Sequence, residues 1–358
     1  MEKKCAAAAR RKRKRRRELP LKIIVDAMGG DNAPQEIVKG AVQAAKARPG
    51  LEIVLVGKEA EVRAAAAACG GLPAGVSVVN ATEVIEMHDD PATAFKTKKD
   101  SSMTVGLTML RDGEGDAFVS AGSTGALLSA GTLLVKRIRG IRRAAMAPLL
   151  PTAGRGLVLV DCGANAECTV EYLIQFAYLG SFYAAKTLGV EKPRVGLLNI
   201  GTEDTKGDRL RQETYQALKE AGDGGHLNFI GNIEAKEAIK GGCDVVVTDG
   251  FSGNVMLKTI EGVGSFMGKE LKGMFLSSLK TKIAALLVKN GLAAFKKRLD
   301  PDTIGGTPFL GLKKPVIKAH GSSKALAIEN AVYQAVSAAE ADLAADIEAN
   351  IDLMKAER

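Results

Sequence analysis

The chain has 358 residues, 46% of them hydrophobic, and 40 glycines, so it can bury the core of one large α/β domain or of two closely joined ones. Tryptophan is absent and only 4% of the residues are aromatic, which argues against nucleic-acid modules that stack bases on aromatic rings. The net charge of +9 comes almost entirely from residues 1–18, which contain ten Lys or Arg and two Glu and therefore carry +8.

Residues 1–20 form a basic arm. Like charges in such a run repel one another, which is typical of a disordered segment, although anionic lipid or nucleic acid also attracts such runs. No apolar core follows the basic residues, which excludes a secretory signal, and no apolar run approaches the ~18–20 residues of a membrane span. Five scattered cysteines without C-x-x-C spacing favour a reducing compartment and exclude a zinc site. We therefore expect a cytoplasmic protein, at most peripheral to a membrane, with no metal.

Short strands and helices alternate from residue 21 onwards, which predicts a doubly wound, mostly parallel sheet. The first strand, at residues 23–25, is followed by a break at Gly29-Gly30, and Asp31 or Asn32 is expected to cap the next helix, with Pro34 in its first turn. Further strands are expected at residues 51–57, 76–80, 157–160, 194–200, 244–248 and 315–319, and from residue 116 onwards. Helices are expected at residues 37–47 and 60–69, and from about residue 324.

Two segments differ from this alternation. Residues 86–102 form a polar loop, in which His88 is either a solvated surface side chain, the favoured interpretation, or an acid–base group. Residues 264–299 have apolar side chains at helical spacing, with eight Lys or Arg between them and a break at Asn290-Gly291. We expect an amphipathic pair of helices there, whose apolar side packs on a core or a sister subunit or lies in a lipid interface.

Several strands end in small hydrogen-bonding residues. Ligands of open α/β sheets bind outside the carboxyl ends of the strands, so these loops are expected to converge. Gly, Ser, Thr and Asn offer backbone N–H groups and short donors to an oxyanion or a phosphate. Taken singly, each loop is equally consistent with a tight structural turn. The candidate phosphate-binding residues are Asp26, Gly29, Gly30, Asp31, Gly122, Ser123, Thr124, Gly125, Asp161, Gly163, Asn165, Asp249, Gly250, Ser252 and Gly253.

Several common catalytic and nucleotide-binding motifs are absent. The chain has no G-x-S-x-G elbow, no Walker A spacing and no G-x-G-x-x-G fingerprint, and its three histidines form no evident triad. The predicted pocket would therefore position a substrate and stabilise charge without a nucleophile from the protein. No cofactor is expected.

Five short blocks carry a resemblance. They are residues 25–31 (VDAMGGD), 120–126 (SAGSTGA), 161–165 (DCGAN), 206–207 (KG) and 249–254 (DGFSGN). In this order they resemble the blocks of the PlsX family, the bacterial acyl-ACP:phosphate acyltransferases of phospholipid synthesis, where ACP is acyl carrier protein. The resemblance covers roughly residues 21–340.

The resemblance implies a reaction in which inorganic phosphate attacks the thioester of a fatty acyl group on ACP and yields acyl phosphate. It implies Lys206 and Asn254 as the catalytic pair, with Lys206 neutralising phosphate or the oxyanion and Asn254 donating a hydrogen bond to the thioester oxygen. It also implies a homodimer whose basic helical hairpin, residues 264–299, touches the inner surface of the cytoplasmic membrane.

The expected organisation is a basic arm at 1–20, a single catalytic α/β domain at 21–345 of the isocitrate/isopropylmalate dehydrogenase-like kind, and a tail at 346–358. One alternative is a phosphate acetyltransferase-like enzyme that uses acyl-CoA. The other is a nucleic-acid binder acting through the basic arm of residues 1–20. Because the rest of the chain is nearly neutral, no specific nucleic acid is expected. Acidic ACP would dock on the cations of residues 136–143 or of the hairpin.

Overall fold

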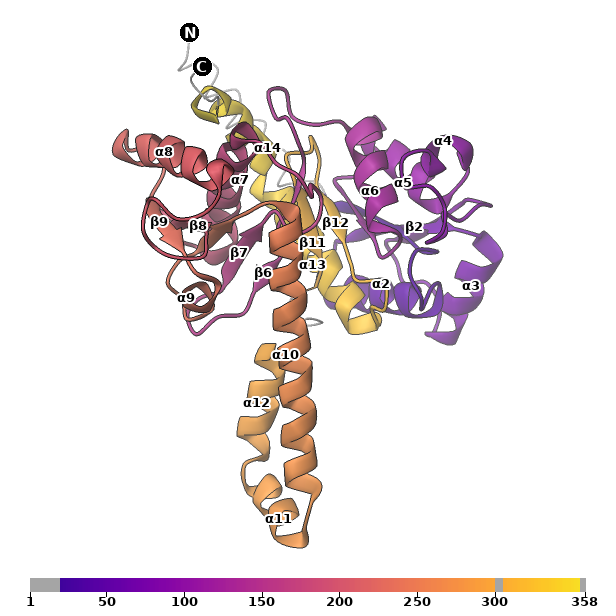
Figure 1. The fold of residues 1–358 in the computed structure, drawn as a ribbon. Helices are drawn as coiled ribbons and strands as arrows, with labels where there is room; N and C mark the ends of the chain where they lie inside the picture. The colour runs from indigo at the N-terminus through magenta and orange to yellow at the C-terminus, as the bar shows by residue number, and fades with distance from the viewer. Residues whose placement is uncertain (1–19, 300–304, 355–358) are drawn as a thin grey trace. The chain divides into compact units, whose positions relative to one another are not determined.

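The computed structural model describes residues 20–299 and 305–354, and they fall into two compact units (Figure 1). Unit 1 contains the described residues up to Lys136 together with Lys314–Asp342, and unit 2 contains those in Arg137–Lys313 and from Leu343 on. The predicted basic arm lies outside the described residues apart from its last position. That the two units act as the single catalytic domain predicted for residues 21–345 stays a prediction.

Unit 1 is built on five parallel strands in the order β3-β2-β1-β4-β12. The strands are β1 (Lys22–Asp26), β2 (Glu52–Gly57), β3 (Val76–Asn80), β4 (Ala117–Ser120) and β12 (Val316–Lys318). The helices are α2 (Gln35–Ala47), α3 (Glu59–Ala68), α4 (Ala94–Thr97), α5 (Ser102–Asp112), α6 (Thr124–Ala130), the π-helix Gly131–Val135 and α13 (Ala325–Ala341).

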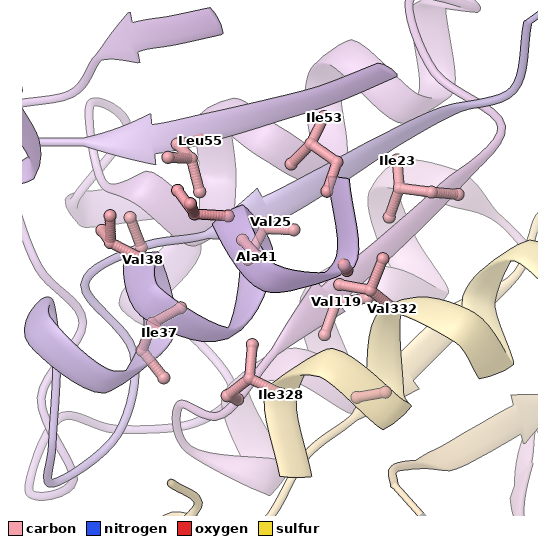
Figure 2. Close-up of a cluster of buried hydrophobic side chains, with 14 of the residues drawn as sticks. Ile23, Val25, Ile37, Val38, Ala41, Ile53, Leu55, Val119, Ile328 and Val332 are labelled. Atoms are coloured by element: carbon pink, nitrogen blue, oxygen red, sulfur yellow. The ribbon is translucent and has the colours of Figure 1, made fainter. Parts of the chain in front are cut away.

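The core of unit 1 lies between this sheet and helices α2 and α13. Figure 2 shows the side chains that fill it, contributed by strands β1, β2 and β4 on one side and by the two helices on the other: Ile23, Val25, Ile53, Leu55, Val119, Ile37, Val38, Ala41, Ile328 and Val332. All of these are buried, and removing each large aliphatic side chain from water stabilises the unit by roughly 1.5–3 kcal/mol. Because strands of a parallel sheet are covered on both faces, their sequences read as continuous apolar runs.

Unit 2 has a second, mostly parallel sheet in the order β6-β7-β10-β8-β9, with β6 antiparallel to β7. Its strands are β6 (Leu149–Leu150), β7 (Leu157–Val160), β8 (Val195–Leu198), β9 (Phe229–Ile233) and β10 (Val245–Val247), and β5 (Ala145–Met146) pairs antiparallel with β11 (Thr307–Leu310). The helices are α7 (Val170–Leu188), α8 (Arg209–Asp223), α9 (Ala235–Ile239), α10 (Gly250–Leu276), α11 (Leu279–Leu287), α12 (Lys289–Leu299), α14 (Leu343–Ala349) and the 3-10 helix Ile351–Met354. The predicted mostly parallel α/β fold is confirmed.

Helix α7 crosses the middle of this sheet at close range. A β-carbon on Gly180 would lie 2.7 Å from Val245 and 2.8 Å from Val160, so only glycine allows the helix to approach strands β7 and β10 so closely. The order of the strands has a consequence for the site. Since β10 lies between β7 and β8, the loops that follow these three strands are neighbours although they are far apart in the chain.

Helices α10, α11 and α12 form an arm of unit 2 in which α10 extends beyond the sheet and α11 lies at its far end (Figure 1). The predicted break at Asn290-Gly291 is wrong, because these residues lie inside α12. The chain breaks instead before α11, where Ser278 and Thr281 form a capping box, and at Val288. Over the part of the chain that the structure describes, no helix has both the length and the apolar character needed to cross a membrane.

The cap predicted for the first helix is also wrong. Helix α2 begins after Pro34 without a hydrogen bond from a capping side chain. The amide of Asn32 instead donates to the carbonyl oxygens of Ser322 (3.0 Å) and Ser323 (3.3 Å). A residue that would cap a helix in isolation thus connects the loop after β1 to the loop after β12.

Candidate active site

In unit 1 the loops that follow β1, β4 and β12 lie against one another. The N–H of Asp31 donates to the carbonyl oxygen of Gly321 at 2.8 Å. Gly30 has a φ of +101°, and a β-carbon there would lie 2.9 Å from both the side chain of Ala121 and the oxygen of Gly321. Glycine is therefore required at position 30 both for the positive φ of the backbone and for the close packing of the loops.

Asp26, at the end of β1, holds these loops together. It is 1% exposed and accepts hydrogen bonds from the Ser120 hydroxyl (2.6 Å) and the Met28 N–H (3.2 Å). Burial raises the pKa of its carboxyl, against the opposing effect of hydrogen bonds from Ser102, Ser120 and the backbone. A β-carbon on Gly29 would lie 2.5 Å from the Asp26 Oδ2, so this carboxylate is packed against its own turn and positions the loop.

The Gly-Ser-Thr-Gly run begins helix α6. Ser123 caps the helix by accepting from the N–H of Ala126 at 3.5 Å, which places Thr124 and Gly125 in its first turn. A β-carbon on Gly125 would lie 2.9 Å from Pro91, so the loop of residues 86–102 covers this helix start. His88 in that loop is exposed, which fits the favoured interpretation as a solvated surface histidine.

Lys318 is a buried cation in unit 1 that the sequence analysis missed. It is 8% exposed, and its ammonium group donates to the carbonyl oxygens of Ala121 (3.2 Å) and Ala319. The sequence did contain a signal for this residue, since Lys318 ends an otherwise apolar predicted strand. It places a positive charge beside the Gly122–Gly125 turn, at the carboxyl ends of β4 and β12.

In unit 2 a second buried carboxylate, Asp161, organises the loop after β7. It accepts from the N–H groups of Met146 (2.8 Å), Ala164 (3.2 Å) and Asn165 (2.6 Å) and from the Asn165 side-chain amide (3.0 Å). Burial raises the pKa of its carboxyl although these donors favour the charged form. With its oxygens so engaged, Asp161 shapes the loop and is poorly placed to contact a ligand directly.

The start of helix α10 packs directly on this loop. The N–H of Gly250 donates to the carbonyl oxygen of Asn165 at 2.7 Å. A β-carbon on Gly253 would lie 1.9 Å from the carbonyl oxygen of Asp161, and one on Gly250 would lie 2.6 Å from that of Asn165. The glycines of the DGFSGN block therefore allow a helix N-terminus to contact the DCGAN loop, and the sequence-predicted convergence of these two blocks is confirmed.

Asn254 points one amide proton into this contact. Its Nδ2 donates to the carbonyl oxygen of Cys162 at 3.2 Å, and Gly163, at φ +133°, makes room for the side chain. An amide nitrogen has two protons, so Asn254 keeps a second donor for a substrate. The neighbouring Cys162 thiol is buried, which raises its pKa well above the usual value and makes it unsuited as a nucleophile.

Lys206 lies on the exposed loop between β8 and α8. The loop is held by Asn199, whose amide donates to the carbonyl oxygen of Lys206 at 3.1 Å, and by the turn at Gly207, which has φ +87°. None of the described carboxylates forms an ion pair with the Lys206 ammonium group, which is exposed to solvent. The cation is therefore available to an anionic ligand.

Arg211 connects the two halves of this site, and the sequence analysis missed it. Its guanidinium contacts Asp208 (2.8 Å), Asp249 and the Ser252 hydroxyl (3.3 Å). Asp208 caps α8, and Asp249 caps α10 through the N–H of Ser252 at 2.8 Å. One half-buried side chain thus joins the starts of the helices next to Lys206 and Asn254.

A sequence model of the family described as "Fatty acid synthesis protein" matches residues 21–346. The chain is 46% identical over 337 residues to a phosphate acyltransferase of Thermoanaerobacter pseudethanolicus, covering 93% of this chain and 98% of the relative. It is 48% identical over 316 residues to a phosphate acyltransferase of Lysinibacillus sphaericus, covering 88% and 93%. The chain belongs to this PlsX family.

A solved structure of a phosphotransacetylase from Streptococcus pyogenes is similar to this PlsX-family chain with a TM-score of 0.59 and 20% identity, covering 90% of this chain and 94% of that one. At this identity the likeness shows a shared fold. Within each unit of the PlsX-family protein, the predicted site residues gather at the carboxyl ends of parallel strands, as described above. That the loops of both units form one pocket stays a prediction.

Metal ligation is not evident in the described part of this PlsX-family protein. Over residues 20–299 and 305–354, no group of three or more His, Cys, Asp or Glu side chains is arranged to hold a metal ion. The expected absence of a metal and of a cofactor stays a prediction. Arg211 and Lys318 are the additions that the structure makes to the predicted set of site residues.

Proposed function

We propose that this protein transfers a fatty acyl group from ACP to inorganic phosphate and releases acyl phosphate for phospholipid synthesis. The observation that carries the proposal is the near-full-length similarity to phosphate acyltransferases, 46% identical over 93% of this chain. Acyl transfer to phosphate is the part that the relatives' names support. The ACP donor and the acyl phosphate product come from the resemblance.

The proposed step needs no nucleophile from the protein. An oxygen of hydrogen phosphate attacks the thioester carbon, a tetrahedral oxyanion forms, and the carbon–sulfur bond then breaks. The proton of hydrogen phosphate ends on the departing sulfur, so the products are acyl phosphate and the free thiol of ACP. Catalysis then consists of holding phosphate in place and stabilising the oxyanion.

Lys206 and Asn254 are the proposed catalytic residues. The exposed ammonium group of Lys206 would neutralise phosphate or the oxyanion, and the second amide proton of Asn254 would be donated to the thioester oxygen. The N–H groups of Gly250 and Ser252 at the start of α10 are already engaged by Asn165 and Asp249, so the helix favours an anion at this place through the positive end of its dipole. The other residues proposed to bind phosphate are Gly163, Asn165, Gly250, Ser252 and Gly253 in unit 2 and the turns at Gly29-Gly30 and Gly122–Gly125 in unit 1. The carboxylates of Asp26, Asp161 and Asp249 are engaged within the protein and shape these loops.

The test is to mix the purified protein with acyl-ACP and phosphate and to trap acyl phosphate with hydroxylamine. We expect acyl hydroxamate that requires both phosphate and protein. Failure to form it with folded protein would reject the proposal. If acyl-CoA were strongly preferred over acyl-ACP, the phosphate acetyltransferase-like alternative, which the phosphotransacetylase fold favours, would replace it.

We also propose that the protein is a cytoplasmic homodimer that contacts the inner membrane surface through the arm of α10–α12. Exposed apolar side chains along the arm support this, among them Phe266, Met274, Leu279, Ile283, Leu286 and Leu287. The finer assignment to the isocitrate/isopropylmalate dehydrogenase-like fold is a proposal of the same kind. DNA binding that is lost on deleting residues 1–18, without acyl transfer, would favour the nucleic-acid alternative.

A further inference from the structure

One face of the first part of α10 lines an apolar groove in unit 2. The groove has a volume of about 610 Å³, within the range of ~300–1,000 Å³ that is usual for small-molecule sites. Its other walls come from the end of β8, the start of α8 and helix α9. The lining residues are Leu198, Asn199, Ile200, Gly207, Asp208, Arg211, Ala235, Ile239, Phe251, Ser252, Val255, Met256, Thr259 and Ile260.

The polar side chains of the groove already have partners within the protein. Arg211 contacts Asp208 and Ser252, as described above, and Asn199 donates to the Lys206 carbonyl. The hydroxyl of Thr259 donates to the carbonyl oxygen of Val255 at 2.8 Å. A ligand that fills the rest of the groove therefore needs no hydrogen-bonding groups, and an alkyl chain can enter without leaving polar groups unpaired.

Large apolar side chains of the groove are open to solvent. The exposed fractions are 80% for Ile200, 67% for Phe251 and 51% for Val255. Exposed apolar side chains that gather around one concave surface are typical of a binding site. Phe251, Val255 and Thr259 lie along the same face of α10, since they are spaced by four residues.

The groove begins at the residues that flank the proposed catalytic pair. Arg211 and Ser252, which join the starts of α8 and α10, line the groove, whereas Lys206 and Asn254 come directly before the lining residues Gly207 and Val255 and do not line it themselves. The acyl chain of a thioester held between Lys206 and Asn254 would pass over this junction to enter the groove. Thr259 and Ile260 lie at the other end, about 6–8 Å further along the helix than Val255 at ~1.5 Å per residue. We infer that the groove binds the fatty acyl chain of the substrate, an inference that rests on the proposed function.

The inference predicts how rate depends on chain length. Each methylene that leaves water contributes about fourfold in binding, the equivalent of ~0.8 kcal/mol. With acyl-ACP of increasing chain length, kcat/KM for hydroxylamine-trapped acyl phosphate is expected to rise by about this factor per methylene and to level off when the groove is filled. Variants that shorten or lengthen the groove should move the length at which it levels off.

Two variants at the far end change the groove in opposite directions. Thr259→Trp is expected to block it, to lower kcat/KM for the longest chains at least about tenfold and to leave the shortest chains unchanged. Ile260→Ala is expected to extend the plateau to longer chains. Val263→Trp is the matched control, because Val263 is 55% exposed on the same helix and does not line the groove.

Binding of the fluorescent fatty acid cis-parinaric acid measures the affinity of the groove for an alkyl chain without requiring the reaction. Thr259→Trp is expected to weaken it at least about tenfold and Val263→Trp to leave it unchanged. Equal chain-length profiles and equal binding in Thr259→Trp and wild type would overturn the inference. The inference would also be overturned if Thr259→Trp changed the molar mass of the protein in light scattering but not its chain-length profile. The groove would then be an interface between copies of this chain. Groove-dependent binding without acyl phosphate would reject the proposed function and keep the inference.

Discussion

Arg211 in α8 and Asp249 at the start of α10 form an ion pair that is mostly withdrawn from solvent, with side-chain exposures of 19% and 8%. The same guanidinium contacts Asp208, the cap of its own helix. Because Lys206 lies two residues before one cap and Asn254 five residues after the other, this single side chain fixes the proposed catalytic residues relative to each other.

Replacing Arg211 with lysine tests this connection. Lysine keeps the charge but lacks the planar fork, so it cannot contact Asp208 and Asp249 together. We expect Arg211→Lys to lower kcat/KM for acyl phosphate formation at least about tenfold and to lower the thermal midpoint by a few degrees, the equivalent of ~1 kcal/mol. The control is Arg209→Lys, since Arg209 is 91% exposed and pairs only with Glu213 among the described residues. Wild-type activity in Arg211→Lys would contradict the connection.

The proposed catalytic pair predicts two different losses. Lys206→Ala removes one charge-assisted contact and should lower kcat/KM about 10- to 100-fold, with no change in the thermal midpoint because the side chain is exposed. Asn254→Ala removes an oxyanion donor and should lower kcat about 100- to 1,000-fold. The exposed Lys219, which pairs with Asp223, provides the control Lys219→Ala, which is expected to keep full activity. A folded Lys206→Ala protein with full activity would remove Lys206 from the mechanism.

Features of the fold that depend on residues close together in the chain could be predicted from the sequence. Apolar runs located the five parallel strands of unit 1 and strands β7, β8 and β10 of unit 2, whereas β6 and β9 were not predicted. Small residues after the predicted strands marked the loops at Gly122–Gly125 and at the DCGAN and DGFSGN blocks. Residues whose roles depend on strand order were missed. Arg211 meets Asp249 because β10 lies between β7 and β8, an order that no local pattern contains. The lysine at the end of the apolar strand β12 was visible in the sequence, but its contact with Ala121 depends on β12 lying beside β4, which no local pattern contains.

The contact of α10 with the DCGAN loop predicts a severe effect of one added methyl group. In Gly253→Ala the β-carbon would lie 1.9 Å from the Asp161 carbonyl oxygen, and Asp161 is itself held by a hydrogen bond to Thr248. We expect a loss of about 3 kcal/mol in the free energy of unfolding and a loss of activity. Gly262→Ala is the matched control on the same helix, because no atom lies within 4 Å of its new β-carbon. It should stabilise by up to ~1 kcal/mol, and equal effects of the two changes would contradict the packing.

The buried carboxyl of Asp26 predicts a pH dependence of stability. Burial raises its pKa in the folded protein, so above the ordinary value of 3.8 the unfolded chain releases this proton first. The free energy of unfolding therefore loses a contribution as the pH rises from 3.8 through the raised pKa, and the loss is then constant. Asp26→Asn lacks the ionisation, so its stability relative to wild type is expected to increase over that range, as measured by urea unfolding at successive pH values. A difference independent of pH would show that Asp26 does not ionise there.

If helices α10–α12 contact the membrane as proposed, changing their exposed apolar side chains should selectively weaken vesicle binding. Leu286 and Leu287 in α11 are 71% and 83% exposed, and inserting a leucine into a lipid interface contributes roughly 1.5–3 kcal/mol. The double change Leu286→Asp with Leu287→Asp is therefore expected to weaken sedimentation with anionic phosphatidylglycerol vesicles at least about 100-fold and to leave acyl transfer to phosphate in solution unchanged. Ile230→Asp, at an exposed apolar position in β9, is the control that should bind vesicles like wild type. Undiminished vesicle binding by the double variant would place the membrane contact elsewhere in the protein.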